Sequence, residues 1–432
     1  MSEITTERSK GYMTFLIIFM GLVALIDQYL NLIEGTAIPY IVEEFWLTPI
    51  QIQTLLTKMG FSTISQFTFW QGVYSLITLS VFLINWSSDA IGRKKGIIIL
   101  LLFMGIPALM VALTPPASII ESLTSDLGFH WFMVLYGIMI MATLSNLWEV
   151  PITEEAPPKR RALYGAIVFF IGLIPIYSFL GPVIARSLGW RWLYGIMFFF
   201  MIGAVVLSLF MKETERWKKE HEKRGGEFLT FKACVEKMTR TDKVYIMVFS
   251  LVYFIWNVGY KFAVIGGGSY YMIVRGVSVE TWSSIYLIVG LMTIVGAILA
   301  GFLMEKVGRN KTLTIGTIGS VVAFILLGLT GMPVFLWCVG LFLALLLGWI
   351  MIYFSEIFPT EYRGTCIGII NTLSRVGYVV GPILTSVLIT LFPEMQMFWI
   401  AGGLIMLTFL VAILIKPYET KAKTLEEIEA ER

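Results

Sequence analysis

Long apolar segments alternate with short polar ones along the whole chain. The apolar segments cover approximately residues 13–40, 67–86, 97–114, 130–150, 163–185 and 193–211, and then 244–265, 282–303, 312–330, 334–354, 365–392 and 397–416. A helix of about 20 apolar residues crosses a hydrocarbon core of roughly 30 Å. The pattern therefore predicts an all-α, polytopic membrane protein with 12 transmembrane helices in two sets of six.

The longest polar stretch divides the two sets. We expect an N-terminal six-helix bundle over residues 1–211, a linker over 212–243, a C-terminal six-helix bundle over 244–416 and a tail over 417–432. Basic loops such as GRKKG, PPKRRA and GRNKT all fall on one face. The positive-inside rule then predicts a multi-pass protein of the plasma membrane with both termini in the cytoplasm.

Composition narrows the classes of function. The chain is 57% hydrophobic and 14% charged, which excludes an ordinary soluble globule, and its net charge of +3 gives no reason to expect nucleic acid as a partner. Its three cysteines and two histidines lack metal-ligand spacing, so we expect no metal and no cofactor. The sequence also lacks a nucleotide-binding loop, so neither ATP-driven transport nor an enzyme is expected. The expected partners are membrane lipids, protons and a small molecule, bound by a monomer.

The two halves of the chain repeat each other. NWSSDAIGRKK (85–95) is echoed by GFLMEKVGRNK (301–311), EEAPPKRRA (154–162) by SEIFPTEYRG (355–364), and KET (212–214) by YET (418–420). The Gly-Pro pair at 181–182 recurs at 381–382 and predicts kinks in two helices. Two homologous halves with a site between them are the construction of many secondary transporters.

These repeats resemble the major facilitator superfamily over essentially the whole length. The resemblance implies alternating access between two bundles, gated by charged loops at the cytoplasmic end. It assigns gating roles to two sets of residues: Asp89, Gly92, Arg93, Lys94, Glu154 and Arg161 in the first half, and Glu305, Gly308, Arg309, Glu356 and Arg363 in the second.

The sequence resembles two branches of that superfamily. The tail KPYETKAKTLEEIE is similar to that of the sugar porters, but their sugar-binding glutamines are absent from the fifth and seventh helices. The run EIFPTEYRGTCIGIINTLSRVGYVVGP instead resembles the eleventh helix of organic-anion transporters and aromatic-acid:proton symporters, which implies an anionic substrate at Arg375. Asp27 matches the first aspartate of those symporters, whereas Leu30 replaces the second.

The physical position of Arg375 agrees with that role. It follows Arg363 by about 12 residues, or roughly 18 Å of helix, which places it near mid-membrane. An unpaired arginine there costs at least about 2.5 kcal/mol. Two interpretations remain open, namely an ion pair with Asp27 or Glu149 and the capture of a substrate carboxylate.

Other polar residues are predicted to line the same interior. Asp27, Asn31 and Glu34 share one face of the first helix, and Tyr253, Trp256, Asn257 and Tyr260 form a stripe on the seventh, although such a stripe is also compatible with plain packing. Lys261 is a second basic candidate. The predicted substrate-binding residues are Arg375, Asn371, Tyr253, Trp256, Asn257, Tyr260, Lys261 and Asn31, and the proton-coupling candidates are Asp27, Glu34 and Glu149, the last two also suiting gates.

Together these features predict a proton-coupled symporter of a small organic anion, in which Arg375 binds the carboxylate and Asp27 carries the proton. A sugar or polyol symporter is the first alternative. A drug exporter and a membrane receptor without transport activity remain further alternatives.

Overall fold

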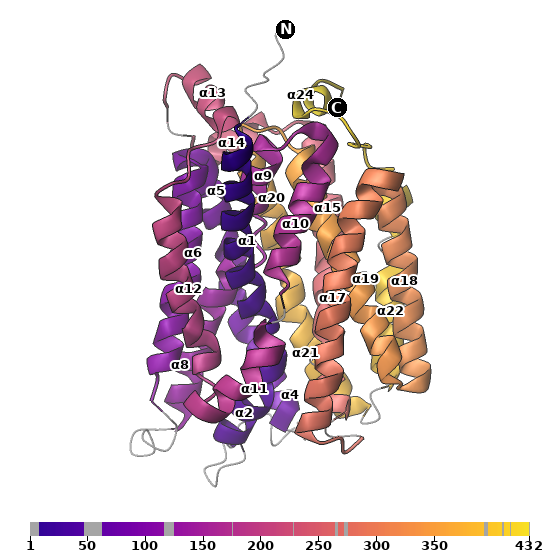
Figure 1. The fold of residues 1–432 in the computed structure, drawn as a ribbon. Coiled ribbons are helices and arrows are strands. Elements are labelled where there is room, and N and C mark those ends of the chain that lie inside the picture. The colour runs from indigo at the N-terminus through magenta and orange to yellow at the C-terminus, as the bar shows by residue number, and fades with distance from the viewer. Residues whose placement is uncertain are drawn as a thin grey trace.

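The computed structural model describes residues 8–46, 63–115, 125–174, 176–227, 229–263, 267–271, 275–392, 396–407, 410–414 and 416–431. Every regular element among these residues is helical. The helices run side by side in one elongated bundle, and both termini lie at the same end of it (Figure 1). We call this end, which also carries α13 (Glu215–Lys223), α14 (Phe231–Lys237) and α24 (Leu425–Glu431), the terminal end, and the opposite one the distal end.

The first half of the chain forms ten α-helices of the described part and two 3₁₀ turns. They are α1 (Lys10–Leu32), α2 (Glu34–Trp46), α4 (Thr63–Tyr74), η1 (Ser75–Ser80), α5 (Val81–Ile91), α6 (Arg93–Leu113), α8 (Ser125–Ala142), α9 (Glu149–Glu155), η2 (Pro158–Arg160), α10 (Arg161–Gly172), α11 (Ile176–Leu188) and α12 (Trp192–Ser208).

The second half continues after α13 and α14 with nine helices of the described part. They are α15 (Arg240–Lys261), α16 (Gly267–Ser269), α17 (Val279–Val307), α18 (Arg309–Thr330), α19 (Pro333–Ile357), α20 (Arg363–Ser374), α21 (Val376–Leu391), α22 (Gln396–Met406) and α23 (Leu410–Leu414). A capping box of Thr239 and Asp242 starts α15, since each side chain accepts a hydrogen bond from the backbone of the other residue.

Eight helical segments of the described part are long and apolar enough to cross a membrane. Three shorter apolar helices, Gly128–Ala142, Arg161–Gly172 and Trp192–Ser208, add to them. Large apolar side chains such as Phe103, Phe199 and Phe302 are 41%, 58% and 53% exposed on the outer surface of the bundle. This apolar exterior is what a bilayer requires of a spanning protein.

Three sequence predictions about helix continuity are wrong. The predicted span 130–150 is interrupted, because α8 ends at Ala142 and α9 begins at Glu149. The span 163–185 is interrupted between Gly172, where α10 ends, and Ile176, where α11 begins, and the span 365–392 is interrupted at Arg375. Both α11 and α21 continue through their Gly-Pro pairs. Proline in a membrane helix is tolerated where neighbouring groups satisfy the freed carbonyl.

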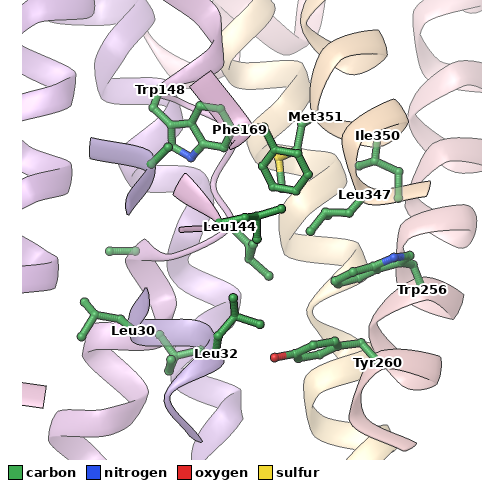
Figure 2. Packing of buried hydrophobic residues seen from close by; sticks show 14 of the residues in the cluster. Leu30, Leu32, Leu144, Trp148, Phe169, Trp256, Tyr260, Leu347, Ile350 and Met351 are labelled. Atoms are coloured by element: carbon green, nitrogen blue, oxygen red, sulfur yellow. The ribbon is translucent and has the colours of Figure 1, made fainter. Parts of the chain in front are cut away.

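The interior between the two halves is packed with large side chains. Figure 2 shows Trp148 and Phe169 of the first half facing Met351 of the second, with Leu144 just below them. The rings of Trp148 and Phe169 stack at 6.2 Å with an interplanar angle of 13°. Farther toward the distal end, Trp256 and Tyr260 stack at 5.2 Å.

Candidate functional site

A cavity lies between the halves, on the distal side of Leu144. Its walls come from α1, α15, α17 and α19, and it spans about 620 Å³ of space, its mouth included. Trp256, Tyr260 and Asn31, three of the predicted site residues, line it. Gln28 also lines the cavity, and its amide nitrogen has no hydrogen-bond partner in the described part of the chain. A concave apolar site with a few polar groups is the usual form of a small-molecule pocket.

Asp27 lies beside this cavity, fully buried on α1, and is bound to the interruption between α8 and α9. One carboxylate oxygen accepts a hydrogen bond of 2.6 Å from the backbone N–H of Leu144, and the other accepts one of 2.6 Å from the indole N–H of Trp148. Both oxygens of this buried carboxylate are therefore held by neutral donors from the fourth helix.

Arg375 binds the same interruption from the other half of the molecule. Its guanidinium donates to the carbonyl of Ile140 at 3.3 Å and to that of Thr143, and it lies 4.8 Å from the centre of the Tyr378 ring. It forms no ion pair with Asp27 or Glu149 in this conformation. The Arg375 guanidinium, which the sequence predicts to bind a carboxylate, is therefore bound to the backbone carbonyls at the end of α8.

Further side chains satisfy the carbonyls inside the interruption. Ser145 O accepts from the amides of Asn371 at 2.7 Å and Asn85 at 2.8 Å, and Leu144 O accepts from the hydroxyl of Tyr253 at 3.3 Å. Two predicted substrate-binding residues, Asn371 and Tyr253, therefore bind backbone in this conformation. A non-helical segment at membrane depth needs such partners, because no lipid group can replace them.

A second charged cluster lies on the distal side. Lys261 of α15 forms a buried ion pair of 2.6 Å with Glu34 of α2. The same carboxylate accepts hydrogen bonds from Tyr136 at 2.9 Å and from Gln71. This pair joins the two halves of the chain. The sequence predicts both charged residues but not Gln71 and Tyr136. The one signal for these two is that they are polar residues within apolar segments.

The remaining predicted residues are separate from these clusters. Glu149 is fully buried, and neither of its carboxylate oxygens has a hydrogen-bond partner among the described residues. Asn257 donates to the carbonyl of Ser374 at 2.9 Å, at the point where α20 ends. In the described ranges no group of three His, Cys, Asp or Glu side chains is placed to hold a metal ion.

At the terminal end, the first set of predicted gating residues joins the halves. Asp89 accepts hydrogen bonds from the backbone of Gly364 at 3.1 Å and of Thr365 at 2.6 Å, and from the Thr365 hydroxyl at 2.7 Å. Asp89 also pairs with Arg93. Glu154 binds Arg93 at 2.8 Å and Arg363 of the other half at 2.9 Å.

The second set forms a related but weaker bridge. Glu356 pairs with Arg309 at 2.6 Å within its own half. Glu305 accepts a hydrogen bond of 3.3 Å from the backbone of Leu163 in the other half, and Arg161 donates to the carbonyl of Lys423 in the tail at 3.4 Å. Lys94, by contrast, donates to Leu209 O and makes no such bridge.

The repeated KET and YET segments cap the helices that follow the gating glycines. The Glu213 carboxylate accepts from the backbone of Arg93 at 2.9 Å, where Gly92 has a φ of 109°. Glu419 does the same for Arg309 after Gly308, whose φ is 95°. A Cβ at Gly92 would collide with the Glu213 carboxylate, which explains the glycine. Burial raises the pKa of Glu213, and its backbone donors oppose that effect.

The threonine of each segment completes the repeat. Thr214 donates to Glu154 at 2.6 Å, and Thr420 donates to Glu356 at 2.5 Å. Glu154 and Glu356 are thus each held by a segment that follows the last helix of its own half.

Comparisons with known proteins agree with this architecture. The family model described as Major Facilitator Superfamily matches residues 13–375 and 294–432. The chain is 25% identical to the arabinose-proton symporter of Bacillus subtilis, with 99% of this chain and 96% of that protein covered. It is also 25% identical to the cis,cis-muconate transport protein of Acinetobacter baylyi, with 69% and 72% covered.

Solved structures give the same fold. The proton:xylose symporter XylE matches with a TM-score of 0.77 at 18% identity, covering 98% of this chain and 100% of that one. The human organic anion transporter MFSD10 matches with a TM-score of 0.71 at 14% identity, covering 94% and 100%.

The fold is therefore that of a polytopic secondary transporter, and the prediction of an all-α, twelve-helix membrane protein in two pseudo-symmetric bundles is confirmed. The chain belongs to the Major Facilitator Superfamily.

Proposed function

We propose that this protein carries a small organic anion across the membrane together with protons, by alternating access between its two halves. The observation that carries the proposal is Arg375, a buried guanidinium whose partners among the described residues are backbone carbonyls and a tyrosine ring. A carboxylate is a far stronger partner for guanidinium than a neutral carbonyl, so an anion can displace those contacts. The muconate transport protein among the relatives supports an anionic substrate.

Asp27 is the proton carrier in this proposal. Its two oxygens accept hydrogen bonds from Leu144 N–H and Trp148 N–H, which place the carboxylate beside the interruption that Arg375 also binds. When a carboxylate binds Arg375, a proton on Asp27 keeps the net charge of the buried site constant, which avoids the large cost of burying an unbalanced charge. Glu34 and Glu149 are the other carboxylates that could accept protons.

The gating part of the proposal uses both ends of the molecule. Contacts between the halves close the terminal end through Asp89 and Glu154 and the distal end through Glu34 and Lys261. Residues 1–211 and 244–416 would rock as two bundles about the cavity, with 212–243 as linker and 417–432 as tail. The terminal end would face the cytoplasm of a cell whose plasma membrane holds the monomer, as the basic loops predict.

A sugar symporter is the second candidate. The arabinose-proton symporter is similar over nearly the full length of both chains, and the cavity is lined by Gln28, Asn31 and stacked aromatic rings that suit a sugar. Arg375 and Lys261 would then have structural roles only.

Uptake into proteoliposomes tests the proposal. Labelled benzoate, sorbate, trans,trans-muconate and arabinose are offered with and without an inward proton gradient. We expect gradient-stimulated uptake of carboxylates, and a loss of about tenfold or more in Arg375→Ala, since a buried charge pair contributes a few kcal/mol. Arg275→Ala, at an exposed position, is the control. Arabinose uptake without carboxylate uptake would instead favour the second candidate.

A further inference from the structure

One tyrosine ring lies between two buried cations. The ring centre of Tyr378 is 4.8 Å from the guanidinium carbon of Arg375 and 4.7 Å from the ammonium nitrogen of Lys261. All three side chains are 1% exposed. The two charges are therefore no further apart than these two distances added together. Two cations this close in an apolar interior repel each other unless negative charge or a π face lies between them.

The neutralising groups of the two cations differ in kind. Lys261 is paired with Glu34, whereas Arg375 is held by carbonyls, with the nearest carboxylate, Asp27, bound to Leu144 and Trp148 instead. Asp27 comes from α1 and Glu34 from α2, whereas both cations come from the second half. Glu34 and Lys261 form an ion pair, while Asp27 and Arg375 bind the same interruption without one. With both carboxylates ionised, these four charges sum to zero.

The ring is also linked to the wall of the cavity. The Tyr378 hydroxyl donates to the side chain of Asn31 at 3.1 Å, and Asn31 lines the cavity. Tyr260, another lining residue, has its ring 5.9 Å from the Lys261 ammonium. The stem of Lys261 lies against Gly381, where an added Cβ would be 3.4 Å from that of the lysine. A turn of the Tyr378 side chain would open the path from the cavity to both cations.

We propose that the preferred substrate is a short dicarboxylate, which replaces the Tyr378 ring with one carboxylate on Arg375 and the other on Lys261. The inference rests on the proposed anion transport and adds its substrate class. In the empty site the π face of the ring interacts favourably with both cations. A dianion would bind both cations more strongly than the ring does, because each carboxylate forms a charged hydrogen bond with one cation. A molecule of about six carbons can place its two carboxylates at such a separation, with each in direct contact with a cation.

Proton coupling follows from the charges. A dianion adds two negative charges to a neutral buried group, and one proton each on Glu34 and Asp27 restores neutrality. The titratable groups that face Glu34 are Lys261, Tyr136, Tyr194 and Tyr378, and those that face Asp27 are Arg375, Tyr253 and Tyr378. Substrate binding takes Lys261 from Glu34 and neutralises the Arg375 charge that acts on Asp27, so the two protonations are expected to accompany dicarboxylate transport.

The test compares two substrates that differ by one carboxylate. The diene acids trans,trans-muconate and sorbate have the same six-carbon skeleton, and the second carries a methyl group where the first carries a carboxylate. We expect proteoliposomes to prefer muconate by about tenfold or more in kcat/KM, and to take up about two protons with each muconate and about one with each sorbate. Lys261→Met should reduce the preference to about one.

Two further variants keep the test decisive. Lys261→Met leaves Glu34 buried without its cation, so the double variant Lys261→Met with Glu34→Gln removes both charges and should also lose the preference while folding better. Arg275→Ala, at an exposed position outside this group of charges, should keep the preference. Equal handling of muconate and sorbate by the unmodified protein would overturn the dicarboxylate inference and leave anion transport standing. Arabinose uptake with no carboxylate uptake would overturn both.

Discussion

At the scale of single residues, two of the buried charges, Asp27 and Arg375, are held by neutral partners. Asp27 accepts from a backbone N–H and an indole, and Arg375 donates to two carbonyls. An exclusive ion pair between the two would be a stable end state with no place for a ligand. Asp27 can exchange its neutral partners for a proton, and Arg375 can exchange its own for a carboxylate. Each exchange costs less free energy than breaking an ion pair, because it leaves no buried charge without a partner.

Asp27→Asn tests the proton role. The asparagine side chain has one acceptor oxygen in place of two, so it can accept from Leu144 or from Trp148 but not from both, and it does not take up a proton. We expect net uptake of the monocarboxylate sorbate to become insensitive to the proton gradient, while exchange of internal for external sorbate persists. The lost acceptor should lower the unfolding free energy by about 1–3 kcal/mol.

The control for this substitution is Glu155→Gln, which neutralises a carboxylate paired with Arg8 at the terminal end. That variant should keep its response to the gradient. A gradient response in Asp27→Asn equal to that of the unmodified protein would remove Asp27 from its role and shift it to Glu34 or Glu149.

Sequence reasoning could find charges but not their partners. Asp27, Glu34, Lys261 and Arg375 stood out because ionisable residues in apolar segments are rare and costly. Tyr378 carried no such signal, since a tyrosine in a membrane helix is ordinary. Its place between two cations depends on the angle at which α15 and α21 pack, which no local pattern encodes.

At the scale of helices, the interruption of the fourth helix is the feature that the sequence concealed. Residues 142–149, ATLSNLWE, contain neither glycine nor proline, and their apolar periodicity is compatible with an unbroken helix. In the structure Leu144 and Asn146 have φ of 49° and 60°. A left-handed conformation costs about 1–2 kcal/mol at a residue with a Cβ, so contacts from other helices must stabilise it.

The local sequence of residues 142–149 favours a helix, whereas contacts from other helices stabilise the interruption. The segment can therefore adopt two states, one helical and one interrupted. Proton binding at Asp27 and anion binding at Arg375 would each remove contacts that hold the interruption open. Two ligands that bias one element in the same direction are coupled through it. A continuous fourth helix is then the expected alternative state when both are bound.

Substitutions at Asn146 test this two-state behaviour, because neither atom of its side-chain amide has a hydrogen-bond partner in the described residues. Glycine adopts a φ of 60° freely and weakens a helix by about 0.5–1 kcal/mol, whereas alanine does the opposite. We expect Asn146→Gly to slow turnover about two- to fivefold, and Asn146→Ala to lower amide hydrogen exchange across residues 143–148.

Ala422→Gly provides the matched control, since Ala422 has the same φ of 60° in the exposed tail. It should change neither turnover nor exchange in the fourth helix. Equal exchange across residues 143–148 in the glycine and alanine variants of Asn146 would contradict the two-state interpretation.

At the scale of the whole molecule, the duplicated gates are not equal. Asp89 receives three hydrogen bonds from the other half, two of them of 2.6 and 2.7 Å from Thr365, whereas its counterpart Glu305 interacts with the backbone N–H groups of Ala162 and, at 3.3 Å, Leu163. The helix caps by Glu213 and Glu419 are alike in both halves. The first copy of the motif therefore contributes most of the free energy that keeps the terminal end closed.

Cys234 reports on that closure. It lies buried in α14, accepts a hydrogen bond of 3.4 Å from the hydroxyl of Thr365, and burial raises the pKa of its thiol to about 11. At neutral pH nearly all of it is the unreactive thiol, because the thiolate forms only as pH approaches the pKa. Its reaction with maleimide should therefore be slow while the terminal end is closed.

In a background of Cys338→Ser and Cys366→Ser, Asp89→Asn should raise the rate of maleimide labelling at Cys234 about tenfold or more at pH 7. The neutral amide keeps one acceptor for three donors and loses the pair with Arg93, which costs a few kcal/mol of closure. Glu305→Gln, the same neutralisation in the other copy, should change the rate about twofold or less. Equal labelling rates in the two variants would contradict this interpretation. They would mean that both copies of the motif contribute equally to the closure of the terminal end, whatever their contacts with the other half.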